Sequence, residues 1–234
     1  MAKLYTEEFF KATVENFMFY RLKNMMIVRT ASGFTKETRR NDPKYQNCTR
    51  SANEFGRVSS LCKQVRYALT GILPKHNNLA VVNSFTKKMR AVLEYDTSNA
   101  RGERQLANAL ATRAGRQQLI GYEFNPDTTI AFDYLLTENA ITVNTKNITL
   151  PKGAKHIGFR VHQFAYDFAT AATELVSGEW GIESKTVTLD LPILSGVTGV
   201  LFTILEAQFY DYVNREFLPM IEDGGKRVLV VGVA

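Results

Sequence analysis

Histidine and cysteine are the side chains most able to bind a metal or act as nucleophiles, and their spacing here favours neither role. Cys48 and Cys62 are the only cysteines, whereas a disulfide framework or a zinc site needs more partners than two cysteines and three scattered histidines provide. His156 and His162 lie six residues apart in a segment with strand character, which separates them by about 20 Å at the usual rise of a strand. We therefore expect two reduced thiols and no metal site.

The sequence lacks the motifs of common enzyme classes. It contains no Gly-x-Gly-x-x-Gly, no Gly-x-Ser-x-Gly and no His-Glu-x-x-His, and Gly225-Lys226-Arg227 lacks the spacing and the following Ser or Thr of a phosphate-binding loop. Carboxylates such as Asp190 and Glu206 are scattered through segments with strand character. We expect no enzymatic activity and no cofactor.

Basic side chains gather in the polar stretch between residues 30 and 50, close to Tyr45. Cations of this kind neutralise phosphates, and an aromatic ring can stack on a base. The alternative is that these charges face solvent or an acidic protein partner. The candidate contacts to nucleic acid or to an acidic partner are Lys36, Arg39, Arg40, Lys44 and Arg50.

Charge is distributed unevenly along the chain. Residues 21–116 hold 19 Lys and Arg against 6 Asp and Glu, whereas residues 117–234 hold 8 against 14. A basic half of one copy can dock on the acidic half of the next, and such head-to-tail contacts close into rings or continue as filaments. The charge pattern thus favours self-association as well as nucleic-acid binding.

Helical periodicity is clearest between residues 55 and 72. Apolar side chains recur there at spacings of 3, 4, 3, 4 and 3, which predicts one stripe of an amphipathic helix; they are Phe55, Val58, Cys62, Val65, Leu69 and Ile72. A second helix is predicted over residues 78–95 and a third over residues 103–116. The short link at residues 73–77 predicts that the first two pack as an antiparallel pair.

Strand patterns occur at both ends of the chain. Residues 17–21 and 25–29 flank Lys23-Asn24 and predict a β-hairpin. After residue 117 the period changes from 3.6 to 2, and about eight short strands with turn signals are typical of a β-sandwich. A change of parity after Val161 predicts a bulge or bend in one of these strands.

The fold class predicted is therefore α+β. An N-terminal β-hairpin and an antiparallel helical pair form a basic region at residues 1–116, and an acidic, immunoglobulin-like antiparallel β-sandwich follows at residues 117–234. The apolar segments at the two ends could each complete the sheet of a neighbouring copy by strand addition. The candidate assembly residues are Phe17, Phe19, Val228 and Val230. The alternative is that both segments close their own sheets.

Several short strings occur in an order that resembles a family of proteins of similar length found in Bacteroidota genomes. They are Phe19-Tyr20-Arg21, Asn41-Asp42-Pro43, Asn53-Glu54-Phe55-Gly56-Arg57, Asn99-Ala100-Arg101-Gly102-Glu103-Arg104, Gly121-Tyr122-Glu123-Phe124-Asn125 and the distal pair Phe209-Tyr210 and Val213-Asn214. The resemblance covers nearly the whole chain, and it departs at residues 3–14, which replace a glycine-rich opening. It implies an N-terminal hairpin, a helical middle and a β-sandwich tail, and it gives no residue a role.

These observations predict a structural or interaction protein that assembles into a homo-oligomer or filament. A nucleic-acid-binding protein acting through residues 21–116 is the alternative, and a sandwich that binds carbohydrate near Trp180 is a weaker one. The sequence has no signal peptide and no apolar stretch long enough to span a membrane, so we expect a cytoplasmic protein.

Overall fold

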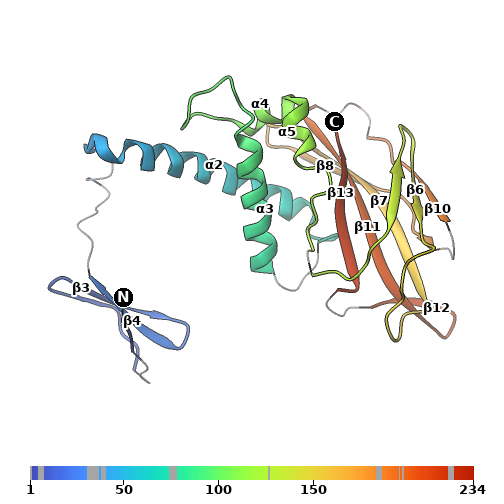
Figure 1. The fold of residues 1–234 in the computed structure, drawn as a ribbon, viewed down its shortest axis with the longest axis horizontal. Coiled ribbons are helices and arrows are strands. Elements are labelled where there is room, and N and C mark those ends of the chain that lie inside the picture. The colour runs from blue at the N-terminus through green and yellow to red at the C-terminus, as the bar shows by residue number, and fades with distance from the viewer. Residues whose placement is uncertain are drawn as a thin grey trace. The chain divides into compact units, whose positions relative to one another are not determined.

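The fold was analysed in a computed structural model of the chain (Figure 1). The structure describes residues 2–4, 8–30, 37, 41–73, 78–125, 127–182, 186–194, 196, 198–220 and 224–234. The chain divides into two compact units, residues 1–51 and residues 52–234, which we call the N-terminal unit and the main unit. We expected a change of domain near residues 116–127, but the helices that precede this point share a hydrophobic core with the sheet that follows it.

The N-terminal unit contains a four-stranded antiparallel sheet. Its strands lie in the order β1 (Ala2–Leu4), β4 (Met25–Thr30), β3 (Phe17–Leu22) and β2 (Ala12–Val14). The predicted hairpin is confirmed as β3 and β4, and Lys23 in its turn has a positive φ of 55°. The outer strands β1 and β2 carry no clear pattern and were not predicted. A short 3₁₀ helix, η1 (Pro43–Tyr45), follows.

In the described part of the chain after η1 there are four α-helices: α2 (Gln46–Ala68), α3 (Asn78–Leu93), α4 (Leu106–Ala111) and α5 (Arg113–Gln117). The predicted stripe on the first of them is buried from Val58 onward, but Phe55 is exposed. The third predicted helix is two helices, because Thr112 has extended backbone and its hydroxyl accepts a hydrogen bond from Gly115 N to begin α5.

Two antiparallel sheets form the rest of the main unit. The larger is built on β7 (His156–Tyr166) and β11 (Val200–Val213), which pair over eleven residues. β8 (Thr173–Ser177) and β9 (Gly181–Ile182) pair with β7, while β12 (Glu216–Pro219) and β13 (Lys226–Val233) pair with β11. The smaller sheet has the order β10 (Thr186–Asp190), β6 (Ala140–Asn144) and β5 (Asp133–Leu136).

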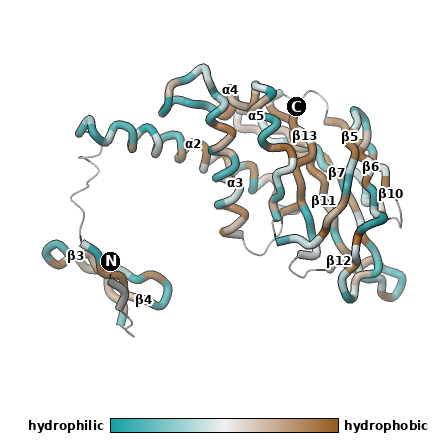
Figure 2. Tube along the Cα trace, in the orientation of Figure 1, coloured by the Kyte–Doolittle hydropathy of each residue, from teal (hydrophilic) through white to brown (hydrophobic). Residues whose placement is uncertain are grey.

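The larger sheet lies between two layers. Helices α2 to α4 pack on one face, where Val58, Phe85 and Leu110 share a core with Phe164 and Phe202. The smaller sheet packs on the other face through a second core. The long strands are therefore buried on both faces, and Figure 2 shows the brown of apolar residues along β11 and β13.

The predicted bulge in β7 is wrong. This strand pairs with β11 in one unbroken register from His156 to Tyr166, and its apparent change of parity arises because both of its faces are buried. The irregularity lies instead between β11 and β13, at Thr203 and Ile204. No helix in the described part of the chain is long and apolar enough to cross a membrane.

Candidate functional site

The predicted basic contacts lie in the N-terminal unit. Lys44 is in η1, where its Nζ is 3.5 Å from Asp42 Oδ2 and 4.8 Å from the centre of the Tyr45 ring. Arg50 is exposed on the first turns of α2. Lys36, Arg39 and Arg40 lie outside the described residues.

The predicted assembly residues Phe17 and Phe19 belong to an apolar face of the N-terminal sheet. Residues that oppose one another in an antiparallel pair point to the same side, and the register places Val14 opposite Phe17 and Val28 opposite Phe19. The ring of Phe10 lies 5.6 Å from that of Phe19. We call this set, Phe10, Val14, Phe17, Phe19 and Val28, the phenylalanine face.

Much of the phenylalanine face is exposed. Phe10, Val14 and Phe17 have exposed fractions of 54%, 56% and 47%. Among the described residues of the N-terminal unit, the only hydrophobic side chains that are fully buried are Met26 and Ile27, each 1% exposed. A sheet this small needs a covered apolar face to be stable. The described residues of this unit leave Phe10, Val14 and Phe17 about half exposed.

The opposite face of the same sheet carries Arg29. Arg29 lies over the Tyr20 ring at 5.6 Å, and its Nη2 lies 3.5 Å from the Sδ atom of Met18. Its long side chain thus covers apolar surface while the charge stays in solvent. Arg21 continues the alternation of Phe17 and Phe19 along β3, so each face of the N-terminal sheet carries one arginine among its described residues.

Val228 and Val230, the other predicted assembly residues, are buried in the main unit. β13 pairs with β11 on one side. On its other side it exchanges backbone hydrogen bonds with residues 121–124, among them Gly121 N to Val230 O and Val230 N to Tyr122 O. This strand closes its own sheet, which is the alternative that the sequence left open.

Two of the strings that carry the family resemblance meet in space. Glu54 Oε1 accepts a hydrogen bond from Gly102 N at 2.6 Å, and Arg57 Nη2 donates to Gly102 O at 2.5 Å. The loop between α3 and α4 is further fixed by Asp96, whose carboxylate accepts hydrogen bonds from the backbone N–H groups of Ser98, Asn99 and Gln105. Glu54, Arg57 and Asp96 therefore serve to hold this loop in shape.

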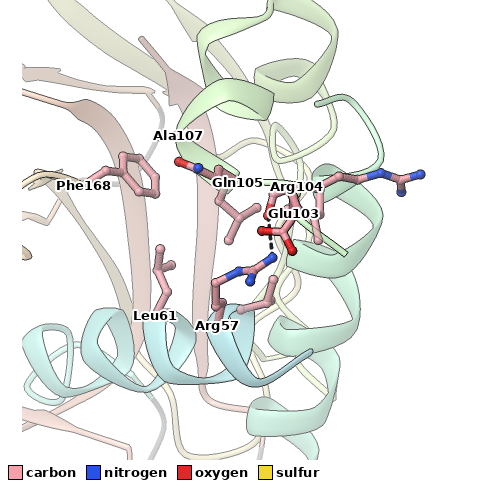
Figure 3. A pocket seen from close by; sticks show the side chains of 10 residues that line it. Arg57, Leu61, Glu103, Arg104, Gln105, Ala107 and Phe168 are labelled. Carbon is pink, nitrogen blue, oxygen red and sulfur yellow. Dashed lines mark hydrogen bonds between the residues drawn. The ribbon is translucent and has the colours of Figure 1, made fainter. Parts of the chain in front are cut away.

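A pocket of about 250 Å³ lies beside this loop (Figure 3). Leu61 and Phe168 line its apolar side, and Glu103 and Gln105 stand on its rim. Ligand pockets for small molecules span roughly 300–1,000 Å³. Arg57, which lines the pocket together with Arg104, already donates to the carbonyl oxygens of Gly102 and Arg104. The pocket is therefore smaller than typical ligand pockets, and the guanidinium of Arg57 is already hydrogen-bonded to the backbone. These two properties argue against a cofactor site here.

A buried polar cluster lies on the larger sheet. Nε2 of His162 is 2.8 Å from Glu206 Oε2, Nδ1 of His162 is 2.8 Å from Ser177 Oγ, and Lys226 Nζ is 2.5 Å from Glu206 Oε1. Because an ionised carboxylate only accepts, Nε2 of His162 carries the proton that it donates. Burial raises the pKa of Glu206. The hydrogen bond from His162 and the charge of Lys226 lower this pKa by more than burial raises it, so the net shift is downward.

This cluster was missed by motif search because its members are brought together by strand register. Ser177 stands opposite His162 in the pairing of β8 with β7, and Glu206 comes from β11. Hydrogen bonds link Ser177 to His162 and His162 to Glu206, which is the order of nucleophile, base and carboxylate used in nucleophilic catalysis. However, His162 and Glu206 are buried, and the N–H of Gly178, beside Ser177, already donates to Val161 O. The cluster therefore satisfies buried polar groups of the sheet.

Trp180 packs against its neighbours. Its ring meets that of Tyr210 edge-on at 5.6 Å, Arg160 lies over it at 5.8 Å, and a Cβ at Gly158 would stand 3.2 Å from it. A platform for sugar stacking needs an open ring face. This packing disfavours the carbohydrate alternative.

The thiols are free, as predicted, with Cys48 exposed and Cys62 buried. Burial raises the pKa of the Cys62 thiol to about 12, so it is not a reactive thiolate. Within the described ranges, no three His, Cys, Asp or Glu side chains are grouped so as to hold a metal ion. Comparison of the chain with protein-family models, with curated proteins and with solved structures finds no match.

Proposed function

We propose that this protein is a non-enzymatic interaction protein that self-associates through its N-terminal sheet. The observation that carries the proposal is the phenylalanine face, which is about half exposed on a sheet with two fully buried side chains among its described residues. Folding a four-stranded sheet costs conformational entropy that so small a core does not offset. A partner surface that covers the phenylalanine face supplies the missing burial.

Exposed apolar side chains also occur in the main unit, where Tyr212 and Phe217 are 39% and 43% exposed and face one another across β11 and β12 with ring centres 5.0 Å apart. Leu135 and Ile193 are 64% and 86% exposed in the main unit, but single exposed apolar residues are normal on soluble proteins. The phenylalanine face differs because its five members are contiguous and three of them are aromatic. Contiguous apolar surface of this kind marks interaction sites.

The test is the mass of the full chain in solution, measured by sedimentation over a range of protein concentrations. We expect the wild-type mass to rise above that of the monomer. Phe17→Ser should lower the association constant at least tenfold, because it removes an aromatic group from the centre of the contact. Leu135→Ser is the matched control on the smaller sheet and should leave association unchanged.

A wild-type chain that stays monomeric at every concentration would overturn the proposal. So would equal loss of association in both variants, because that result would point to general destabilisation. Circular dichroism of Phe17→Ser separates loss of contact from loss of the strand.

A second candidate function, nucleic-acid binding, is favoured by one specific observation. Cations lie over aromatic rings in both units, an arrangement suited to phosphate contact and base stacking. The pairs are Arg21–Phe9, Arg29–Tyr20, Lys44–Tyr45, Lys63–Tyr67 and Arg90–Phe55.

Fluorescence anisotropy with a single-stranded oligonucleotide tests this second candidate. Binding should weaken steeply as salt rises, and it should be lost in the triple variant Arg39→Glu, Arg40→Glu, Lys44→Glu. Affinity that is independent of salt, or that survives the triple charge reversal, would rule out this basic stretch as the contact.

A further inference from the structure

We infer that a groove between α2 and α3 binds a nucleotide, with the phosphate at one end and the base at the other. The groove lies wholly in the main unit, so this inference goes beyond self-association and does not depend on the N-terminal sheet. Its volume is about 440 Å³, and small-molecule sites usually span roughly 300–1,000 Å³. The lining residues that carry the inference are Phe55, Ser59, Asn83, Lys87, Arg90 and Glu94.

Phe55 is the member of the predicted apolar stripe that the structure leaves outside the core. Its ring is 47% exposed and lines the groove, whereas the stripe is buried from Val58 onward. The guanidinium of Arg90 lies over this ring, 5.6 Å from its centre. Exposed aromatic rings and arginine planes are the surfaces on which bases stack. The Arg90–Phe55 pair therefore gives the groove a place for a base.

Donors from both helices meet at the groove without partners of their own. Ser59 of α2 and Asn83 and Lys87 of α3 line it, and within the described residues no side chain of the three makes a hydrogen bond or an ion pair. The smaller pocket beside the α3–α4 loop differs, because Arg57 there is already hydrogen-bonded to the backbone. Lysine, hydroxyl and amide groups are the donors that bind phosphate oxygens. The free donors of the groove therefore fit a phosphate.

The two ends of the groove differ in charge. Lys87 and Glu94 are seven residues apart on α3, which places them on one face and about 10 Å apart along the helix axis. Both are exposed, and neither forms an ion pair with another described residue. The carboxylate of Glu94 would repel a ligand that is anionic throughout, but it accepts hydrogen bonds from the N–H groups of a base edge. A nucleotide has this polarity, with an anionic phosphate at one end and N–H donors at the other.

Isothermal titration calorimetry of the full chain with guanosine 5′-monophosphate tests the inference, because the edge of guanine carries N–H donors for Glu94. We expect its affinity to exceed that of ribose 5-phosphate, which lacks the base, by at least about tenfold. A chain that binds neither compound would overturn the site. Equal affinity for both would overturn the assignment of a nucleotide.

A pair of charge reversals locates the binding. Lys87→Glu puts a carboxylate where the phosphate should lie and should lower the affinity for guanosine monophosphate by at least about tenfold. Lys63→Glu makes the same change in charge on α2, outside the groove, where Lys63 lies over Tyr67, and should leave the affinity within about twofold. Both lysines are exposed, and circular dichroism checks that both variants fold. Equal loss in the two variants would overturn the groove as the site, because it would show a general attraction of anions to a basic chain.

A labelled single-stranded oligonucleotide distinguishes the two sources of this chemistry. If the groove holds one residue of a strand, guanosine monophosphate should displace the oligonucleotide, and Lys87→Glu should weaken its binding. If the groove holds a free nucleotide, guanosine monophosphate should bind without displacing it. Sedimentation tests self-association separately, so that the failure of either proposal is distinguishable from the failure of the other.

Discussion

Buried carboxylates fix the irregular parts of the main unit. Asp96 is 3% exposed and accepts hydrogen bonds from three backbone N–H groups and from the side chains of Ser98 and Asn99. Burial alone would raise the pKa of Asp96, but these donors lower it well below its usual range. A loop with no regular structure is held in one conformation in this way, because a carboxylate satisfies several donors at once.

Glu206 gives a prediction at the residue scale. Its pKa is lowered from an ordinary value of 4.5, so the ionised form stabilises the fold above that value and the contribution is lost as pH falls. We expect Glu206→Gln to lower the free energy of unfolding at pH 7 by about 2–4 kcal/mol, because Lys226 loses its buried partner.

Urea denaturation between pH 3 and pH 7 measures this effect. The difference between wild type and Glu206→Gln should narrow as the pH falls below 4.5, because the stabilisation by the ionised carboxylate is lost in that direction. Asp190→Asn, at the exposed end of β10, should stay within about 0.5 kcal/mol of wild type throughout. A difference that widens as pH falls would contradict the assigned shift.

At the scale of elements, Gly158 shows how a missing side chain organises β7. A Cβ there would stand 2.9 Å from Tyr210 Cε2 and 3.2 Å from Ile182 Cγ1 and Trp180 Cε3. The absence of a side chain lets two aromatic rings lie against the backbone of the strand. The aromatic cluster at this end of the sheet therefore depends on one glycine.

Replacing a glycine should lower stability in strand β7, at Gly158, and raise stability in helix α2, at Gly56. Gly158→Val should lower stability by about 1–3 kcal/mol through overpacking and change the fluorescence of Trp180. Gly56→Ala lies within α2, where an added Cβ meets nothing within 4 Å, and should raise stability by about 0.5–1 kcal/mol. Thermal unfolding checks both, and a neutral Gly158→Val would show that the rings move aside freely.

The elements differ in how far the sequence predicted them. The hairpin of β3 and β4 and the stripe from Val58 to Ile72 were predicted because each has a single regular period. β7 was misread because its two faces are covered by different layers, which removes the alternation. The cluster of His162, Glu206 and Ser177 was not predicted, since only strand register brings it together. The signal that could have found it is the polar residues that interrupt otherwise apolar strands.

At the scale of the whole molecule, the two units should differ in protection from hydrogen exchange. β7 and β11 are paired on both sides and buried on both faces, so their amides should exchange most slowly. Residues 12–30 should exchange rapidly in dilute protein. In concentrated protein they should become protected, because association covers the N-terminal sheet. Mass spectrometry of peptides measures hydrogen exchange in both units. If the protection of residues 12–30 does not change with protein concentration, that result would contradict the proposed contact.

The distance along the chain between paired segments sets a time scale for folding. In the N-terminal sheet, β2, β3 and β4 are joined by short turns. In the main unit, by contrast, Asn125 Nδ2 donates to Lys226 O and Gly121 N donates to Val230 O, across more than a hundred residues. Contacts between remote residues form slowly, on the order of milliseconds to seconds, and local hairpins form in about 1–10 μs. A chain that begins to fold therefore forms its aromatic hairpin long before the larger sheet of the main unit is complete. During that interval, concentrated chains contact one another first through their N-terminal segments.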